Sequence, residues 1–270
     1  MSERNERPSG QAAPRLRWAS LDSPALREPL RFLLSVPDGP GPHPLTVLLH
    51  GRGDGAESWE PVSDALPAGV VAIPDAPWLD RAGYWVDSAH PDGRAVETAI
   101  VRNLVGDLEA RLPIAPDRTA RTVAGYSMGG AGAVRLGLAN TGVFGTVIAL
   151  SPAVYDPDPP PGSSARESGA FGTAHTRYDH SVYERLGYRA ALAAHPASTP
   201  TRLLVAVGDA EEPHPGAPPD AAVAVQAAAL VGLANAAPGV RAELRRFPGG
   251  HGWETWRPAL LWALSSARDR

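Results

Sequence analysis

The chain has 270 residues, of which 43% are hydrophobic, and a formal net charge of −4. This length suits one α/β domain with a full core, and the mild negative charge argues against a surface for nucleic acid or anionic membranes. The sequence contains neither cysteine nor lysine, which excludes disulfides, thiolate metal sites, thiol catalysis and lysine nucleophiles.

Residues 1–14 are polar and charged, which predicts a disordered tail ahead of a single domain spanning residues 15–270. The tail lacks the apolar centre of a signal peptide, and no apolar run reaches the roughly 18 residues of a membrane span. We therefore expect a cytoplasmic protein that acts on a small molecule and binds neither membrane nor nucleic acid. The sequence is also compatible with a homo-oligomer.

Short apolar segments and longer segments of helical periodicity alternate along most of the chain. In chain order, strands are expected at residues 16–21, 30–36, 45–50, 70–73, 121–124, 146–150, 202–207 and 241–247, and helices at 96–111, 130–140, 182–194, 221–236 and 254–267. The first two strands suggest an antiparallel pair. The later alternation predicts a mostly parallel, doubly wound sheet with helices on both faces.

Residues 151–181 interrupt this alternation with a long stretch rich in proline and glycine. Long loops in compact domains are usually functional. Because the stretch follows the predicted strand at 146–150, it emerges at the carboxyl edge of the sheet. We interpret it as a flap over a pocket, with a solvent-exposed insertion as the alternative.

The most informative motif is Gly125-Tyr126-Ser127-Met128-Gly129, which fits the G-x-S-x-G pattern of a nucleophile elbow. A predicted strand precedes it and a predicted helix of small residues follows, which is the setting that this motif requires. The turn forces the serine into a strained backbone conformation, and the glycines avoid steric clashes. Ser127 is therefore the expected nucleophile, exposed at the carboxyl end of the sheet.

A serine nucleophile needs a base and an orienting acid, which follow it in the order Ser, acid, His in such folds. His251 lies between glycines after the last predicted strand and is the expected base. The acid should lie on the loop that follows the strand at 202–207. We favour Glu211, three residues past Gly208, and keep Asp209 as the alternative.

Two backbone N–H groups should stabilise the oxyanion. One is expected from Met128, directly after the nucleophile, and the other from Arg52 in the glycine-rich loop after the strand at 45–50. The Arg52 side chain could also bind an anionic part of the substrate. Trp59, Tyr126 and Trp253 are candidates for the substrate pocket. No metal or other cofactor is expected.

These motifs resemble the α/β-hydrolase superfamily, and more narrowly its esterase group related to esterase D, feruloyl esterases, siderophore esterases and the antigen 85 mycolyltransferases. The matching segments are Leu49-His50-Gly51 with Trp59, the elbow through Gly130, and Gly250-His251-Gly252-Trp253. The resemblance implies an α/β-hydrolase fold and a serine esterase that forms an acyl-enzyme. Transfer of the acyl group to an acceptor other than water, or a non-catalytic binding role, are the alternatives.

Overall fold

One eight-stranded sheet forms the centre of the protein. The computed structural model describes residues 16–213 and 217–267, so the predicted tail at 1–14 lies outside the described residues. The strand order is β1-β2-β4-β3-β5-β6-β7-β8, with β2 antiparallel to both β1 and β4 and all other neighbours parallel. The strands are β1 (Arg17–Ser23), β2 (Glu28–Ser35), β3 (Leu45–Leu49), β4 (Val70–Pro74), β5 (Arg121–Tyr126), β6 (Thr146–Leu150), β7 (Thr201–Gly208) and β8 (Val240–Phe247).

The central strands read as continuous apolar runs because helices cover both of their faces. Every residue of β3, β4 and β6 is buried. The register pairs Leu49 with Gly125 and Gly125 with Ala149, so β3, β5 and β6 end at nearly the same level. The loops that follow these strands therefore meet at one edge of the sheet, where ligands bind in folds of this kind.

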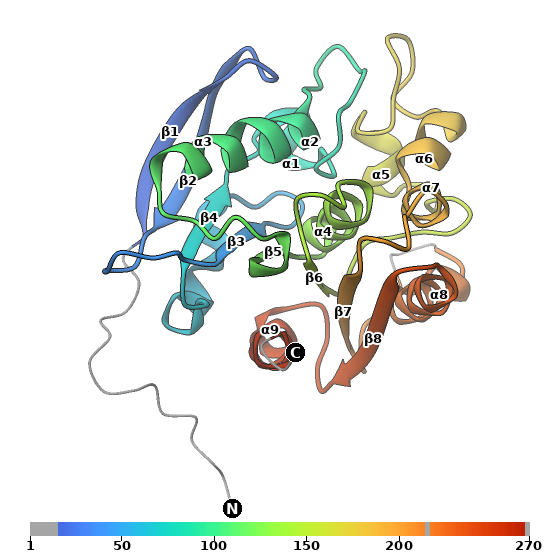
Figure 1. Ribbon diagram of the computed structural model, residues 1–270. Coiled ribbons are helices and arrows are strands. Elements are labelled where there is room, and N and C mark those ends of the chain that lie inside the picture. The colour runs from blue at the N-terminus through green and yellow to red at the C-terminus, as the bar shows by residue number, and fades with distance from the viewer. Residues whose placement is uncertain (1–15, 214–216, 268–270) are drawn as a thin grey trace, which may run out of the picture.

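Helices form a layer on each side of the sheet, as Figure 1 shows for α4 and α8 on one side and α9 on the other. The first layer buries aliphatic side chains of α4, α7, α8 and the helical stretch before β5. The second consists of α9 and η1. The helical elements are η1 (Ala56–Ala65), α1 (Trp78–Arg81), α2 (Val96–Thr98), η2 (Ala99–Leu104), α3 (Val105–Arg111), η3 (Arg118–Ala120), α4 (Met128–Ala139), α5 (Ser164–Glu167), α6 (His180–Leu186), α7 (Tyr188–Ala193), η4 (Pro219–Ala221), α8 (Val223–Ala236) and α9 (Trp253–Ser266).

The structure differs from the predicted helices in two places. The helix expected at 182–194 is two helices, α6 and α7, that meet at Gly187, whose extended backbone (φ −70°, ψ 163°) ends one and begins the other. The short elements η1, α1, η3 and α5 were not predicted. Pro61 lies inside η1, and α1 contains left-handed residues at Leu79 and Asp80, so neither shows a simple amphipathic pattern.

The segment 151–181 is anchored rather than loose. It contains α5, and Phe171 is 5% exposed and packs against Tyr84 with 5.4 Å between ring centroids. The Ser88 hydroxyl donates to the Gly169 carbonyl at 2.7 Å. These contacts hold the segment against residues 84–88, beside the sheet edge described above. Its action as a flap remains a prediction.

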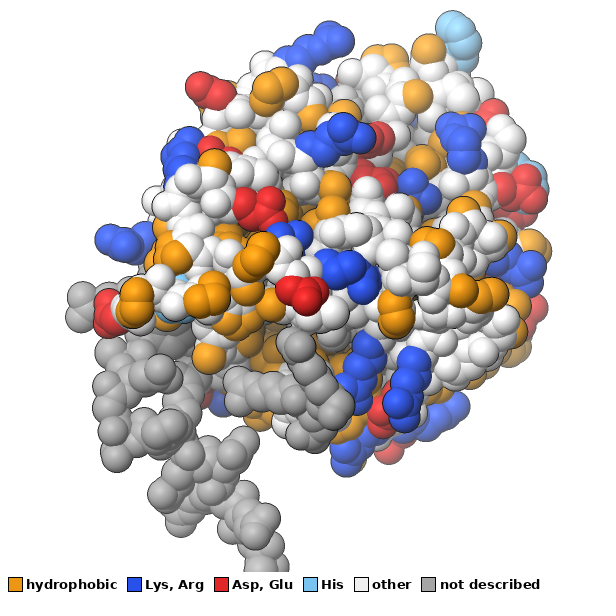
Figure 2. Space-filling model, in the orientation of Figure 1, with side chains coloured by type: hydrophobic (Ala, Val, Ile, Leu, Met, Phe, Trp, Pro, Cys, Tyr) orange, Lys and Arg blue, Asp and Glu red, His pale blue; other side chains and the backbone are white. Residues whose placement is uncertain are grey.

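The surface mixes both signs of charge. On the face shown in Figure 2, arginines and acidic side chains are interspersed with apolar ones. Across residues 16–213 and 217–267, no helix has the length and apolar character needed to cross a membrane.

Candidate active site

Ser127 occupies a strained turn between β5 and α4. Its backbone lies at φ 55° and ψ −121°, outside the regions that a residue with a side chain normally adopts. The turn is close-packed: a Cβ on Gly129 would lie 2.2 Å from the Leu49 carbonyl oxygen, and one on Gly125 would lie 2.1 Å from the Gly129 oxygen. Only glycine fits at both positions, which explains the motif sterically.

The side chains of Ser127, His251 and Glu211 form one hydrogen-bonded chain. His251 Nε2 lies 2.9 Å from Ser127 Oγ, and His251 Nδ1 lies 2.8 Å from Glu211 Oε2. The Glu211 side chain is fully buried, whereas that of His251 is 40% exposed. Because a carboxylate accepts hydrogen bonds, Nδ1 carries the proton and Nε2 is left to accept one from the serine hydroxyl. A nucleophile, a base and an orienting acid require a hydrogen-bonded chain of this geometry.

Glu211 is held by further donors that the sequence analysis missed. The Gly208 N–H donates to Glu211 Oε1 at 2.7 Å, and the Ser151 hydroxyl donates to the same oxygen. Trp256 Nε1 in turn donates to Ser151 Oγ at 2.9 Å. Ser151 directly follows β6 and is fully buried. A serine at the carboxyl end of the strand between the elbow and the acid was the available signal.

Asp209, the alternative acid, forms no hydrogen bond or ion pair with His251. Its Oδ1 accepts a hydrogen bond from the Gly249 N–H at 3.0 Å. The Ala210 N–H donates to the Gly249 carbonyl at 3.0 Å as well. Asp209 thus ties the loop after β7 to the loop that carries His251, while Glu211 reaches the imidazole.

Two backbone N–H groups near the elbow have no acceptor in the described part of the chain. Among the described residues, neither the Met128 N–H at the start of α4 nor the Arg52 N–H has a hydrogen-bond partner. The loop that contains Arg52 lies against the first turn of α4, because a Cβ on Gly129 would also come within 2.6 Å of the His50 carbonyl oxygen. Both N–H groups are therefore free to donate to a ligand, which an oxyanion site requires.

His50 supports this loop. Its ring is fully buried, Nε2 accepts a hydrogen bond from the Ala76 N–H at 3.2 Å, and Nδ1 donates to the Gly51 carbonyl at 2.9 Å. Burial lowers the pKa of His50, so the imidazole is neutral. With both ring nitrogens occupied, His50 connects the loop after β3 to the segment after β4.

The three predicted pocket aromatics pack behind the site. Trp59 and Tyr126 are 0% and 1% exposed, and the Tyr126 hydroxyl donates to Asp54 at 2.7 Å. Trp253 is partly exposed and packs edge-to-face against both, with centroids 5.4 and 5.1 Å apart. Trp59 and Tyr126 therefore occupy core positions that a substrate outside the molecule does not reach. Of the three, only Trp253 has a side chain that is partly exposed to solvent.

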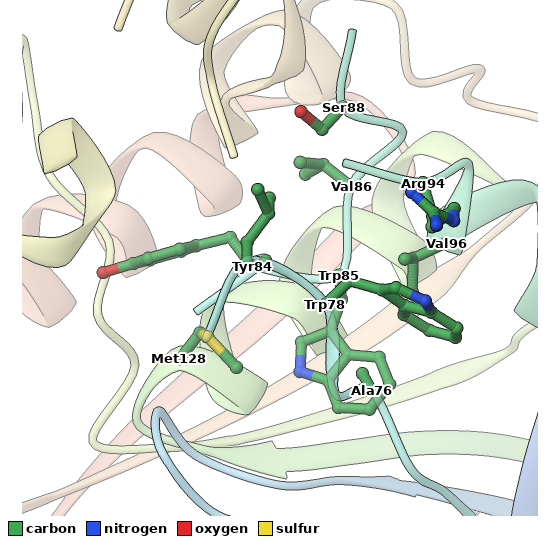
Figure 3. A pocket seen from close by; sticks show the side chains of 11 residues that line it. Ala76, Trp78, Tyr84, Trp85, Val86, Ser88, Arg94, Val96 and Met128 are labelled. Carbon is green, nitrogen blue, oxygen red and sulfur yellow. The ribbon is translucent and has the colours of Figure 1, made fainter. Parts of the chain in front are cut away.

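A small apolar pocket instead opens beside Met128. Its lining residues come mainly from the segment after β4, and Figure 3 shows Tyr84 and Met128 on one side of it and Val96 and Arg94 on the other. Tyr84 and Val86 also line a second pocket that extends toward Phe171 and Tyr183. Apart from Met128, no sequence motif marks the residues of either pocket. Within residues 16–213 and 217–267, no group of three or more His, Asp or Glu side chains could hold a metal ion.

Comparison with known proteins assigns the family. The model of a family described as "Putative esterase" matches residues 43–266. The chain belongs to this family. It is an enzyme with an α/β-hydrolase fold that hydrolyses carboxylic esters. No curated protein matches by sequence.

Solved structures share the fold of this esterase across nearly its whole length. An S-formylglutathione hydrolase from Agrobacterium tumefaciens is 16% identical, with a TM-score of 0.72 over 97% of this chain and 98% of that one. A ferulic acid esterase is 19% identical, with a TM-score of 0.71 over 94% and 98%. A ferulic acid esterase from Anaeromyces mucronatus, in complex with ferulic acid, is 15% identical, with a TM-score of 0.67 over 97% and 93%.

Proposed function

We propose that this esterase cleaves its substrate through a covalent acyl-enzyme on Ser127. The observation that carries the proposal is the unbroken hydrogen-bonded chain from Ser127 through His251 to Glu211, with separations of 2.9 and 2.8 Å. A serine hydroxyl is a poor nucleophile until a base accepts its proton. The tautomer imposed by Glu211 leaves His251 Nε2 ready to do so.

The proposed reaction has two halves. Ser127 Oγ attacks the ester carbonyl carbon while His251 takes the hydroxyl proton, and the N–H groups of Met128 and Arg52 stabilise the oxyanion. Each such donor contributes roughly 3 to 4 kcal/mol to the stability of the transition state. His251 then gives the proton to the leaving alkoxide, which departs as the alcohol. Water, deprotonated by the same imidazole, releases the carboxylic acid and restores Ser127.

Exposure favours water over another acyl acceptor. The His251 side chain is 40% exposed, so a water molecule can reach the imidazole that would deprotonate it. An acyltransferase benefits from excluding water from this position. Hydrolysis is therefore our proposal for the acyl-enzyme, and release of free acid in the presence of an added alcohol tests it directly.

The deciding experiment compares Ser127→Ala with the wild type. We expect p-nitrophenyl butyrate turnover to fall by about 10³-fold or more and fluorophosphonate labelling to disappear. Ser265→Ala is the matched control, because Ser265 is exposed and its hydroxyl donates a hydrogen bond only to the Trp262 carbonyl of the same helix, at 2.9 Å. It should keep both activity and labelling. A folded Ser127→Ala protein with near-native turnover would refute the proposal, and a wild type that neither labels nor hydrolyses would support a binding protein.

A further inference from the structure

The glycine-rich loop after β3 carries the Arg52 N–H, and its own sequence does little to hold that donor in place. Arg52 lies between Gly51 and Gly53, and Gly55 follows two residues later. Glycine loses more conformational freedom on folding than any other residue, so a loop of this composition needs contacts from outside to become rigid. A donor to an oxyanion is effective when its position is fixed before the reaction begins.

Tyr126 fixes the beginning of this loop. A Cβ on Gly51 would lie 2.6 Å from the Tyr126 ring, so the two residues are in close contact. The Tyr126 hydroxyl also donates to the Asp54 carboxylate at 2.7 Å. Because Tyr126 directly precedes Ser127, these contacts tie the loop to the elbow.

Arg81 fixes the residues that follow Arg52. The Arg81 carbonyl accepts the Gly53 N–H at 3.0 Å, and Arg81 Nη1 donates to the Asp54 carbonyl at 3.0 Å. The same Nη1 pairs at 2.6 Å with Asp75, which directly follows β4 and whose side chain is 12% exposed. Arg81 therefore connects the loop to the end of a central strand.

The segment that contains Arg81 has a strained backbone. Leu79, Asp80 and Arg81 have φ values of 53°, 52° and 59°, and Trp85 has a φ of 60°. Left-handed residues other than glycine are costly, persist only where surrounding contacts fix them, and cluster at functional sites. Trp85 Nε1 also donates to the His50 carbonyl at 3.2 Å, so this segment contacts the chain on both sides of Arg52.

We infer that Arg81 is a positioning residue for the oxyanion site. Through Gly53 and Asp54 it holds the Arg52 N–H where the ester oxygen becomes negatively charged. The guanidinium suits this role because it donates to a carbonyl and to a carboxylate at the same time. Arg81 acts through the loop and not on the substrate. This inference rests on the proposed acyl-enzyme at Ser127 and on the Arg52 N–H as a donor.

The test compares p-nitrophenyl butyrate with p-nitrophenyl thionobutyrate, in which sulfur replaces the carbonyl oxygen. Sulfur is a weak hydrogen-bond acceptor, so hydrolysis of the thionoester depends less on the oxyanion donors. In Arg81→Gln we expect kcat for the oxoester to fall about tenfold with little change in KM, because the lost interaction acts in the transition state. The oxoester-to-thionoester ratio of kcat should fall about fivefold.

Arg257→Gln is the matched control. Arg257 on α9 donates to the Pro61 carbonyl at 2.7 Å and pairs with Asp64 at 2.8 Å, and its side chain is 39% exposed against 36% for Arg81. The two variants thus lose the same kinds of contact, but only Arg81 contacts the loop after β3. Arg257→Gln should leave the ratio unchanged, and thermal unfolding followed by circular dichroism verifies that each variant is folded.

Asp75→Asn is a milder second variant, because it keeps the shape of the side chain and weakens only the ion pair that fixes Arg81. It should lower the ratio about twofold to threefold. If Arg81→Gln did not fold, an unchanged ratio in Asp75→Asn would still overturn the inference.

The outcomes separate this inference from the proposed function. A folded Arg81→Gln protein with the wild-type ratio would overturn the positioning role and leave the acyl-enzyme proposal standing. Equal losses on the two esters would also overturn it, because they would indicate a general effect on the fold. Failure of the wild type to hydrolyse either ester, together with no fluorophosphonate labelling, would instead refute the proposed function.

Discussion

Ser151 links the buried acid to the core, and its removal should weaken both stability and turnover. Glu211 is fully buried, and two donors hold its Oε1, the Gly208 N–H and the Ser151 hydroxyl. Ser151→Ala removes one of these hydrogen bonds, which is worth about 1.5 to 3 kcal/mol when the acceptor is charged. It also leaves the buried Trp256 Nε1–H without an acceptor, at about 1 to 3 kcal/mol. We expect the free energy of unfolding to fall by roughly 3 to 5 kcal/mol.

The effect of Ser151→Ala on turnover should be smaller, because the Gly208 N–H and the His251 imidazole still hold the carboxylate. If about 1 kcal/mol of the lost interaction served to orient Glu211, kcat would fall about fivefold. Urea denaturation and p-nitrophenyl butyrate kinetics measure the two effects on one preparation.

Ser163→Ala is a matched control for this experiment. Ser163 is 2% exposed, and its hydroxyl has no hydrogen-bond partner. Removing it should leave the unfolding free energy within about 0.5 kcal/mol or raise it. If Ser151→Ala were as stable and as active as Ser163→Ala, the chain of hydrogen bonds from Trp256 to Glu211 would contribute nothing to stability or turnover, which would refute this prediction.

Three further predictions follow from the site. Glu211→Gln should lower kcat strongly while leaving measurable activity, and Asp209→Asn, which alters only a loop contact, should have the smaller effect; the reverse ranking in steady-state kinetics would assign the orienting role to Asp209. Gly129→Ala should prevent folding or destabilise the protein by more than about 3 kcal/mol in urea denaturation, because its Cβ would lie 2.2 Å from the Leu49 carbonyl oxygen; native-like stability would show that the elbow can relax. Burial lowers the pKa of His50, so the unfolded chain takes up a proton that the folded protein does not, and the unfolding free energy should decrease as the pH falls below 6.5. His50→Gln should show a smaller decrease between pH 8 and pH 5, and an unchanged slope would mean that other groups cause it.

Local patterns were sufficient to predict the order of elements and the edge at which the site forms. All eight strands were expected within two or three residues of their observed limits, because apolar runs bounded by glycine and proline have few alternatives in a covered sheet. The edge followed from chain order, since parallel strands end on the same side. Ser127 and His251 each follow such a strand, and the structure brings their side chains within 2.9 Å.

Choices among neighbouring residues required the tertiary structure. Asp209 and Glu211 lie on one loop, and only the position of the His251 imidazole determines which carboxylate can reach it. Trp59 is an aromatic residue of the kind that lines substrate pockets, yet it lies on η1 and packs in the core against Trp253 of α9. The only local signal for Ser151 was its place at the carboxyl end of β6, because its partners are 60 and 105 residues away in the sequence.

The sequence by itself thus determined the periodic features of this protein, its layered α/β architecture and the strained turn at Ser127, since these depend on side-chain polarity and steric fit among near neighbours. The tertiary structure decided which side chains meet across the loops: Glu211 with His251, Ser151 with Glu211, and Trp256 with Ser151. The physical reason is that a hydrogen bond or an ion contact depends on separations of about 3 Å between atoms distant in the chain. Such separations are set by how the helices pack on the sheet.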